Sequence, residues 1–350
     1  MAVKFTKPEI NVREKLAELD KPSGIAGEAM LRAETPQEQF NLIGAGRRNL
    51  LINGDFQVSQ RGDYTSASSA NVSYFVDRWY TDVANAVSAN RQHISGIDIP
   101  DTPSISKGVR LVATSSGTSY IGVRQKIENP TQYVGRTFTY SGWVRSNTPN
   151  ARLTSYGQGS PNQVIVSQPH SGSGKWEKLS VTFTLFSSMS NAWYVSAFLS
   201  TAGIGSVAQV TGDYIEVTQL QMELGKVATP FEHRSYGEEL ALCQRYYASY
   251  GGTSYTGIVT GVVYNNVSAM YQFLFPHTMR ATPSISFSNL ISTDRIAYDS
   301  NVTALQTQGI SNNAVCFKSV HASNSASARQ GCLLAIKNGS TGFIAFSAEL

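Results

Sequence analysis

Residue types that commonly carry enzyme chemistry occur in this chain, but not at catalytic or metal-binding spacings. The five histidines share no zinc-ligand spacing, and the Gly-x-Ser-x-Gly turn of serine hydrolases does not occur. Segment 203–208, Gly-Ile-Gly-Ser-Val-Ala, matches a dinucleotide fingerprint, but that fingerprint needs a helix opening at its glycines. Here the run leads into a strand pattern, so we interpret it as a β-hairpin loop. We expect no enzymatic activity, although carboxylates that meet only in the fold would support glycan cleavage.

Aromatic side chains give the sequence its best binding candidates. Sugars stack their C–H faces on aromatic rings, while polar neighbours bind the hydroxyl groups. Trp79 lies within a strand pattern, which favours a place in the core. Trp143 has the opposite strand phase from Phe138 and Tyr140, so we expect it on the other side of its sheet, as a platform or an inter-subunit contact. The candidates for a glycan platform, which include one tyrosine in a glycine-flanked loop, are Trp143, Tyr156, Trp176 and Trp193.

Composition limits the classes of partner. The net charge of +4 on 350 residues is mild and includes no dense basic block, which argues against nucleic acid as a main ligand. No apolar window is long enough for a membrane-spanning helix, so we expect no membrane insertion. The three cysteines form no close pair and are interpreted as buried small side chains of a protein made in a reducing cytoplasm.

The first 48 residues differ from the rest of the chain. They hold 15 of its 52 charged residues. A capping box at residues 35–38, Thr-Pro-Gln-Glu, predicts a short helix over Pro36–Ile43. Pieces this short bury no core alone, so we expect residues 1–48 to be an extended segment with short helices that becomes ordered on a partner.

The remainder of the chain has β patterns. In Lys178–Leu185 every second residue is apolar, which is the pattern of a half-buried strand. No helical pattern separates the strands of residues 49–234, which excludes parallel βαβ units and predicts an antiparallel sandwich or jelly roll. Residues 251–350 carry further strands, and roughly 100 residues suit a second, smaller β-sandwich.

The stretch Gln219–Tyr247 joins the two β regions. Its first part continues a strand pattern that slips in phase near Gln219. Gly225 ends this strand, and Pro230 prevents a helix from starting at once.

A short helix is predicted within the second part of this stretch. Ser235 and Glu238 stand three residues apart, as in a capping box, just before an apolar run at helical spacing. We therefore expect residues 235–250 to form a linking helix. Glu238, Glu239 and His233 are interpreted as capping and surface groups rather than as catalytic groups.

Several short motifs, taken in order, resemble parts of bacteriophage tail-fibre and appendage proteins. Segment 49–62, which opens Asn-Leu-Leu-Ile-Asn-Gly-Asp-Phe, and residues 77–79, Asp-Arg-Trp, are similar to the start of a β-sandwich module in those proteins. Segment 219–247 resembles the end of that module, and residues 279–283 with the terminal Ala-Glu-Leu resemble the last domain of such fibres. Residues 1–48 are similar to virion-attachment segments from phages of marine cyanobacteria and related hosts.

The resemblance covers nearly the whole chain and implies a homotrimeric structural protein of a virion, such as a short tail fibre, assembled in the host cytoplasm. It implies that residues 1–48 dock on the tail or an adaptor protein. Residues 49–234 would form a jelly roll of the carbohydrate-binding type that attaches to host cell-surface polysaccharide, and residues 251–350 a distal β domain. Two alternatives stay open: an adaptor or capsid-decoration protein without a glycan site, and a glycan depolymerase.

Two further expectations follow from the implied trimer and jelly roll. In the linking helix, Leu240, Cys243 and Tyr247 are candidates for contacts at a three-fold axis, with packing on the chain's own sandwich as the alternative. Jelly-roll sugar modules often hold a structural calcium ion near their first strand. Asp55 and Asp213 are the candidate oxygen ligands, with turn carboxylates as the alternative. No other cofactor is expected.

Overall fold

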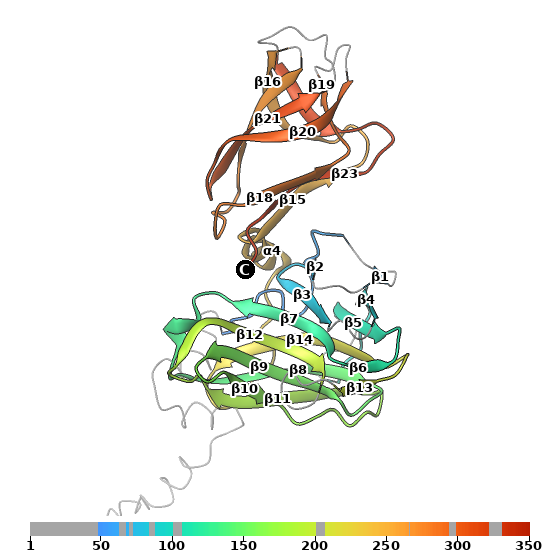
Figure 1. Cartoon of the computed structure of the whole chain (residues 1–350), viewed down its shortest axis with the longest axis vertical. Helices are drawn as coiled ribbons and strands as arrows, with labels where there is room; N and C mark the ends of the chain where they lie inside the picture. The colour runs from blue at the N-terminus through green and yellow to red at the C-terminus, as the bar shows by residue number, and fades with distance from the viewer. Residues whose placement is uncertain are drawn as a thin grey trace, which may run out of the picture.

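The computed structural model describes residues 48–62, 68–69, 73–83, 88–100, 107–200, 207–265, 267–293, 299–321 and 331–350. The expectations for the head, including the helix over Pro36–Ile43, lie outside these residues. The described part of the chain forms two β-rich bodies with one α-helix and the C-terminus between them (Figure 1). The prediction of a mainly β protein is confirmed. No helix in these ranges is both long enough and apolar enough to cross a membrane.

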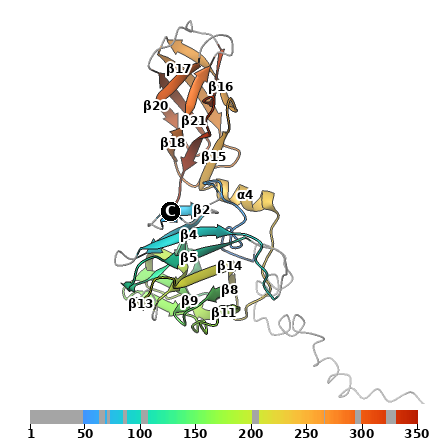
Figure 2. The ribbon, with the colours of Figure 1, turned by 90° about the vertical axis from the view of Figure 1, so that its right-hand side faces the viewer.

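The first body is a sandwich of two antiparallel sheets (Figure 2). The strands of sheet A, in spatial order, are β1 (Ser68–Ser69), β4 (Ala89–Ile94), β5 (Gly108–Ala113), β14 (Tyr214–Leu224), β8 (Thr137–Ser146) and β11 (Trp176–Thr184). Those of sheet B are β10 (Gln163–Val166), β9 (Ala151–Gly159), β12 (Met189–Leu199), β7 (Ile121–Ile127), β3 (Trp79–Val83) and β2 (Ser73–Val76). A small ribbon pairs β6 (Gly117–Ser119) with β13 (Val207–Gln209), and a 3-10 turn, η1 (Pro130–Tyr133), follows β7.

The strand order is that of a jelly roll. Numbered 1 to 8 along the chain, the strands concerned are β5, β7, β8, β9, β10, β11, β12 and β14. Sheet A then contains them in the order 1-8-3-6 and sheet B in the order 5-4-7-2. Two interleaved Greek keys give this arrangement, in which successive strands alternate between the sheets except for β9 and β10, which pair as a hairpin within sheet B. The predicted jelly roll is therefore confirmed, with extra strands at one edge of each sheet.

One hydrophobic core fills the space between the sheets. In β11, Leu179 is buried and its neighbour Ser180 is exposed, as the alternation predicted. The ring of Trp193 is 0% exposed and lies 5.1 Å from that of Phe138, and its indole N–H donates to the Ser155 hydroxyl at 2.8 Å. Trp193 therefore has no face left for a sugar, and its prediction as a glycan platform is wrong.

The second body is a closed antiparallel barrel with a smaller sheet beside it, where the sequence predicted a small sandwich. The barrel strands, in spatial order, are β16 (Gly257–Asn265), β17 (Ser268–Leu274), β21 (Ala314–His321), β20 (Asp299–Ile310), β19 (Leu290–Thr293) and β22 (Gly331–Ile336). The smaller sheet contains β15 (Tyr247–Gly252), β23 (Gly342–Ser347) and β18 (Ser284–Ser288). Pairing of β16 with β22 closes the barrel and so removes the exposed strand edges of an open sheet.

Helix α4 (Tyr236–Gln244) lies between the two bodies (Figure 2). Its predicted capping box is present. The Ser235 hydroxyl accepts from the Glu238 amide at 3.3 Å, and the Glu238 carboxylate accepts from the Ser235 amide at 3.0 Å. These bonds satisfy amide groups that have no partner inside the helix.

The helix packs on its own chain, which corrects one of the three predicted trimer contacts, Cys243, and the placement of another, Tyr247, within the helix. Cys243 is 0% exposed within a single chain, so it has no surface for a sister helix. Tyr247 belongs to β15 rather than to the helix, and the guanidinium of Arg61 lies 3.6 Å from its ring centroid. Leu240 is half-buried.

Candidate functional site

The phase slip predicted near Gln219 is a bulge in β14. The ladder between β14 and β8 is interrupted between Thr218 and Gln221, and Gln219 has a φ of 50°, which side chains rarely adopt. The freed amide of Leu220 donates to the carbonyl of Gly54 at 2.8 Å. A Cβ on Gly54 would lie 2.1 Å from the Leu220 carbonyl oxygen, so this approach requires glycine.

The opening segment of the jelly roll holds the bulge in place. The side-chain amide of Asn49 donates to the Leu220 carbonyl at 3.1 Å, and its oxygen accepts from the Met222 amide at 3.0 Å. The two ends of the jelly roll, which the sequence presented as separate motifs, therefore meet at one point. Because of the bulge, the Gln219 side chain leaves the regular pairing of β14 with β8.

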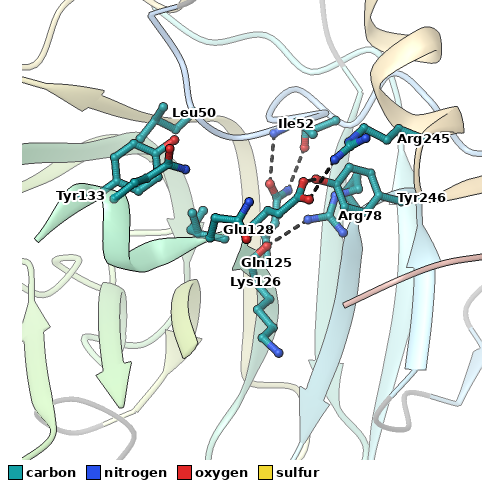
Figure 3. Close-up of a pocket in the computed structure, with 12 residues that line it drawn as sticks. Leu50, Ile52, Arg78, Gln125, Lys126, Glu128, Tyr133, Arg245 and Tyr246 are labelled. Atoms are coloured by element: carbon teal, nitrogen blue, oxygen red, sulfur yellow. Dashed lines mark hydrogen bonds and ion pairs between the residues drawn. The ribbon is translucent and has the colours of Figure 1, made fainter. Parts of the chain in front are cut away.

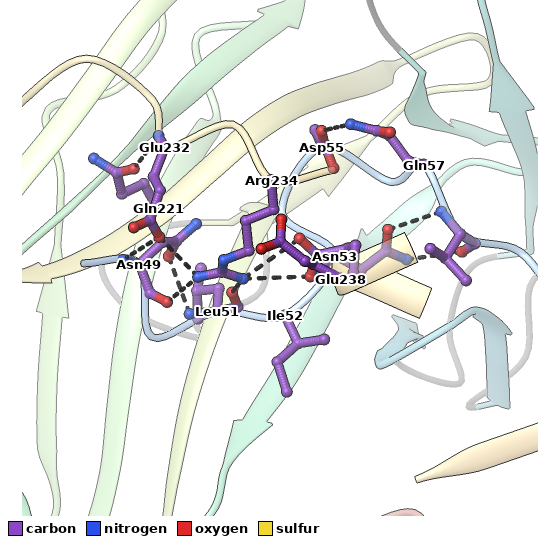
Figure 4. A network of polar contacts seen from close by, with 12 residues as sticks. Asn49, Leu51, Ile52, Asn53, Asp55, Gln57, Gln221, Glu232, Arg234 and Glu238 are labelled. Atoms are coloured by element: carbon purple, nitrogen blue, oxygen red, sulfur yellow. Dashed lines mark hydrogen bonds and ion pairs between the residues drawn. The ribbon is translucent and has the colours of Figure 1, made fainter. Parts of the chain in front are cut away.

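A half-buried carboxylate fixes the chain that follows β14 against this segment. Glu232 accepts from the amides of Arg48 and Asn49 at 2.9 and 2.8 Å and pairs with Arg234 at 2.9 Å. Burial alone would raise the pKa of Glu232, but these donors hold its pKa below the ordinary value. The Glu232 amide in turn donates to the Gln221 side-chain oxygen at 2.8 Å (Figure 4). The loop leading to α4 is thereby held over the outer face of sheet A.

The prediction that Glu239 is a surface group is wrong. Its side chain is buried and accepts from the Asn53 amide at 2.5 Å, and Arg234 lies 3.3 Å away. Burial raises the pKa of Glu239, and the guanidinium of Arg234 partly offsets that rise. Glu239 therefore anchors α4 to the opening segment of the jelly roll.

This arrangement encloses a cavity of about 440 Å³ on the outer face of sheet A, which we call the sheet A cavity. Strand β8 contributes two side chains, β11 one, and the bulged part of β14 two; the loop before α4 forms the remaining wall. The lining residues are Ser141, Trp143, Lys178, Gln219, Gln221, Thr229, Pro230, Phe231 and His233.

Two of the predicted aromatic candidates meet on this face. Trp143 is 7% exposed and packs with Ile97 and Ile99, and the half-buried Trp176 packs against the same cluster. Trp143 was placed on the correct side of its sheet by its strand phase. The guanidinium of Arg145 lies 5.2 Å from the Trp176 ring, so Trp176 forms the edge of the cluster rather than a free platform.

Gln219 brings an unpaired polar group to the cavity. Its side chain is 4% exposed, and its Nε2 atom has no hydrogen-bond partner among the described residues. A buried donor without a partner costs about 1–3 kcal/mol. Such a group in a native structure calls for an explanation, and a bound molecule in the cavity would supply the missing acceptor.

The other predicted site residues lie elsewhere. Tyr156 is in strand β9, not in a loop, on the outer face of sheet B, where its ring stacks 6.1 Å from that of Tyr194. Sequence reasoning missed Gln219, Gln221, Lys178, Phe231 and His233 as lining residues. The phase slip was the one available signal, because it marks where a side chain leaves the ladder.

Asp55 and Asp213 do not share a site. Asp55 follows Gly54, which bonds Leu220, whereas Asp213 precedes β14 at its other end. Leu220 lies seven positions after Asp213 along the chain, roughly 23 Å at about 3.3 Å per strand residue. Asp213 accepts from the Val210 amide at 2.9 Å as a turn carboxylate, and burial raises the pKa of Asp55. The described residues contain no group of three or more His, Cys, Asp or Glu that could hold a metal ion.

A second cavity, of about 220 Å³, lies where the end of β7 meets α4 and β15 (Figure 3). Three of its charged side chains are engaged within the chain. Glu128 accepts from the Tyr246 hydroxyl at 2.5 Å and pairs with Arg245 at 2.8 Å, and Arg78 donates to the Lys126 carbonyl at 2.9 Å. We therefore interpret this cavity as part of the contact between the two bodies.

Comparison with known proteins gives distant structural similarity only. No protein-family model matches the chain, and no curated protein matches it. The enzymatically active domain of tailspike protein 4 from bacteriophage CBA120 is 13% identical over 51% of this chain, with a TM-score of 0.33; the match spans 21% of that chain. TmCBM61 in complex with β-1,4-galactotriose is 12% identical over 51% of this chain and all of its own, with a TM-score of 0.30. The CBM22-2 xylan-binding domain of Paenibacillus barcinonensis Xyn10C is 13% identical over 47% of this chain and 97% of its own, with a TM-score of 0.31. The chain is thus a β-sandwich protein with distant similarity in fold to carbohydrate-binding modules and to a phage tailspike domain.

Proposed function

We propose that this chain is a non-enzymatic, glycan-binding component of a phage virion appendage, and that the sheet A cavity is its saccharide site. The observation that carries the proposal is the unpaired, buried amide of Gln219 beside the indole of Trp143 in that cavity. A volume of about 440 Å³ lies within the range of roughly 300–1,000 Å³ that is usual for small-molecule sites.

The cavity wall combines the two kinds of group that saccharides require. Trp143 and Phe231 offer aromatic surface for the C–H faces of a sugar ring. Gln219 and Ser141 offer an amide and a hydroxyl group for sugar hydroxyls. The walls come from three strands and one anchored loop, so they are held in place before a ligand binds.

The virion context rests on the order of the motifs in the sequence. The opening segment, the joint and the terminal Ala-Glu-Leu resemble tail-fibre proteins in that order, and residues 1–48 resemble virion-attachment segments. We propose a homotrimer attached by its head to the tail or an adaptor, in which several weak sites add up to firm attachment. Light scattering tests the trimer, and a stable monomer near 38.0 kDa would contradict it.

Binding assays with host-envelope polysaccharides test the site. The full chain should be retained on at least one such polysaccharide. Gln219→Met, which keeps the side-chain length but removes the donor, should weaken binding about tenfold, or 1.4 kcal/mol. The matched control Gln272→Met changes an exposed glutamine of the barrel and should leave binding unchanged.

The same preparations separate the alternatives. No retention on any host polysaccharide would favour an adaptor or decoration protein without a glycan site. Release of reducing sugar from purified envelope would favour a depolymerase. Binding of Gln219→Met as tight as that of the unchanged chain would show that the sheet A cavity is not the site.

A further inference from the structure

We propose that sheet A carries a second site, for an oxyanion, on its outer face at Arg110, Glu216 and Arg145, which we call the arginine row. Its ligand is a carboxylate or sulfate group carried by a polysaccharide. The class of ligand rests on the proposed function, but the arginine row shares no residue with the sheet A cavity. The two sites can therefore be tested separately.

The arginine row crosses three neighbouring strands of sheet A (Figure 2). In the ladder, Glu216 of β14 lies opposite Arg110 of β5 on one side and Arg145 of β8 on the other. Val217 and Val144, which alternate with these residues, are buried in the core between the sheets. Because successive side chains of a strand point to opposite faces, the three charged side chains lie on the outer face.

The row holds more positive than negative charge. The Glu216 side chain is 1% exposed, and one of its carboxylate oxygens lies 3.2 Å from Nη1 of Arg110. The other oxygen accepts from Nε of Arg145. Two guanidinium groups against one carboxylate leave a net charge of +1 at the row. The buried carboxylate is therefore paired, and one positive charge remains for a ligand.

Both guanidinium groups keep N–H donors that the chain does not use. Within the described ranges, Arg145 donates through Nε alone, and Arg110 contacts Glu216 through Nη1 alone. Nε of Arg110 is buried and has no hydrogen-bond partner there. The side chains of Arg110 and Arg145 are 36% and 37% exposed, so an oxyanion can reach their outer N–H groups from solvent.

Aromatic rings hold both guanidinium groups in position. The guanidinium carbon of Arg110 lies 4.8 Å from the Tyr214 ring centroid, and that of Arg145 lies 5.2 Å from the Trp176 ring. Contacts of this kind within about 6 Å of a ring are attractive. The planar fork of a guanidinium also matches the oxygens of a carboxylate or similar oxyanion. The row is therefore arranged for an oxyanion before one binds.

The carboxylates in adjoining segments oppose an anion only weakly. Asp213, which precedes Tyr214, accepts from a backbone amide of its own turn at 2.9 Å. Glu177, which follows Trp176, accepts from the Ser173 hydroxyl at 2.9 Å. Asp98 and Lys175 are both exposed, where water and salt screen their opposite charges.

The test measures binding of the full chain to matched oligosaccharides by isothermal titration calorimetry. Each set contains a neutral sugar, its uronic acid and its sulfated form, and the sets are built on galactose and on glucose. We expect at least one acidic member to bind at least about tenfold more tightly than its neutral counterpart, with an affinity that falls as NaCl is added. The two acidic forms show whether a carboxylate or a sulfate group is preferred. Equal affinities within every set, or no binding of any acidic member, would overturn the proposal.

Variants assign the acidic preference to the arginine row. Arg145→Gln keeps a donor for Glu216 but removes the charge, and should weaken binding of the acidic member about tenfold. Arg110→Gln repeats this test from the other side of the row. Glu216→Gln removes the negative charge between the arginines and should tighten binding, which a purely structural row would not do. The matched control Arg136→Gln changes an exposed arginine of the jelly roll and should leave binding unchanged.

The variants also separate this site from the sheet A cavity. Unchanged affinity in Arg145→Gln together with a loss in Gln219→Met would place the acidic sugar in the cavity and overturn the second site alone. Equal weakening in Arg145→Gln and Arg136→Gln would mean that general charge attraction accounts for binding, and would overturn it as well.

Discussion

The carboxylate of Glu349, the penultimate residue, lies 2.7 Å from the guanidinium of Arg78, which stands at the turn before β3 of the jelly roll. Arg61 lies 3.0 Å from the same carboxylate and 3.0 Å from Asp77. All four side chains are largely buried, so two positive and two negative charges balance where the two bodies meet. The end of the chain is therefore bound to the opening motifs of the first body.

This contact brings together short motifs that are far apart in the sequence. The Arg78 guanidinium also lies 3.6 Å from the Tyr246 ring centroid, and Tyr246 bonds Glu128 of the jelly roll (Figure 3). The segments 60–62, 77–79 and 348–350 and the residues after α4 thus belong to one junction. We infer that it holds the second body at a defined angle to the first.

Removing the charge of Glu349 should destabilise this junction. Glu349→Gln leaves the positive charges of Arg61 and Arg78 in excess in a buried place, and breaking a buried ion pair from one side costs about 3–5 kcal/mol. Urea unfolding followed by tryptophan fluorescence should show a loss of at least about 2 kcal/mol. The control Lys337→Gln removes an exposed charge and should change the free energy of unfolding by less than about 0.5 kcal/mol. Equal changes in the free energy of unfolding in the two variants would mean that the charge cluster contributes little to stability.

The local features of the fold follow from the sequence alone. Alternation in Lys178–Leu185 and the capping box at Ser235 depend only on neighbouring residues, and both were predicted. The buried position of Trp193 was also readable, since it alternates in phase with Val195 and Ala197, both of which are buried. For Trp193, the strand phase was a better guide to its position than its residue type, which suggested a sugar platform.

The candidate site depends on contacts that no local pattern contains. The Gln219 side chain is buried, with its Nε2 atom unpaired, because Asn49 and Gly54 form hydrogen bonds with Leu220. Asn49 and Leu220 lie 171 residues apart in the chain. Closure of the barrel likewise requires β16 to pair with β22, strands that are far apart in sequence. A strand in a barrel and a strand in a sandwich have the same alternation, so the sequence could not separate these two forms.

Two glycine substitutions should have opposite effects on stability. Gly54→Ala places a Cβ 2.1 Å from the Leu220 carbonyl oxygen, and such overpacking costs about 1–3 kcal/mol. Because it displaces the bulge, it should also weaken saccharide binding. Gly237→Ala lies in the first turn of α4 with open space around its Cβ, and should stabilise by up to about 1 kcal/mol. Thermal unfolding measures both; a stable Gly54→Ala with normal binding would contradict the account of the bulge.

The three thiols should differ in reactivity. Cys243 is 0% exposed and burial raises its pKa well above the ordinary value, so little thiolate forms and reagents do not reach it. Cys332 is 7% exposed, whereas Cys316 is half-buried. Mass spectrometry after brief iodoacetamide treatment of the native protein should therefore find Cys316 modified first, and Cys243 only in urea. Cys316→Ser should remove the fast reaction. Rapid modification of Cys243 would show that α4 detaches from the jelly roll in solution.

The charge cluster should also make stability depend on pH through Asp77. Burial, partly offset by Arg61, raises the pKa of Asp77 from 3.8 to about 6. The folded protein then binds the Asp77 proton more tightly than the unfolded chain. Protonation of Asp77 therefore adds to the free energy of unfolding below about pH 4, and this addition is lost as the pH rises to about 6. A shift of this size corresponds to about 3 kcal/mol, at 1.36 kcal/mol for each pKa unit. Free energies of unfolding in urea at pH 4, 5, 6 and 7 should fall across this window in the wild type. In Asp77→Asn the free energy of unfolding should fall by about 3 kcal/mol less over the same pH range. Parallel curves for the two proteins would show that Asp77 ionises normally and that the cluster is open to water.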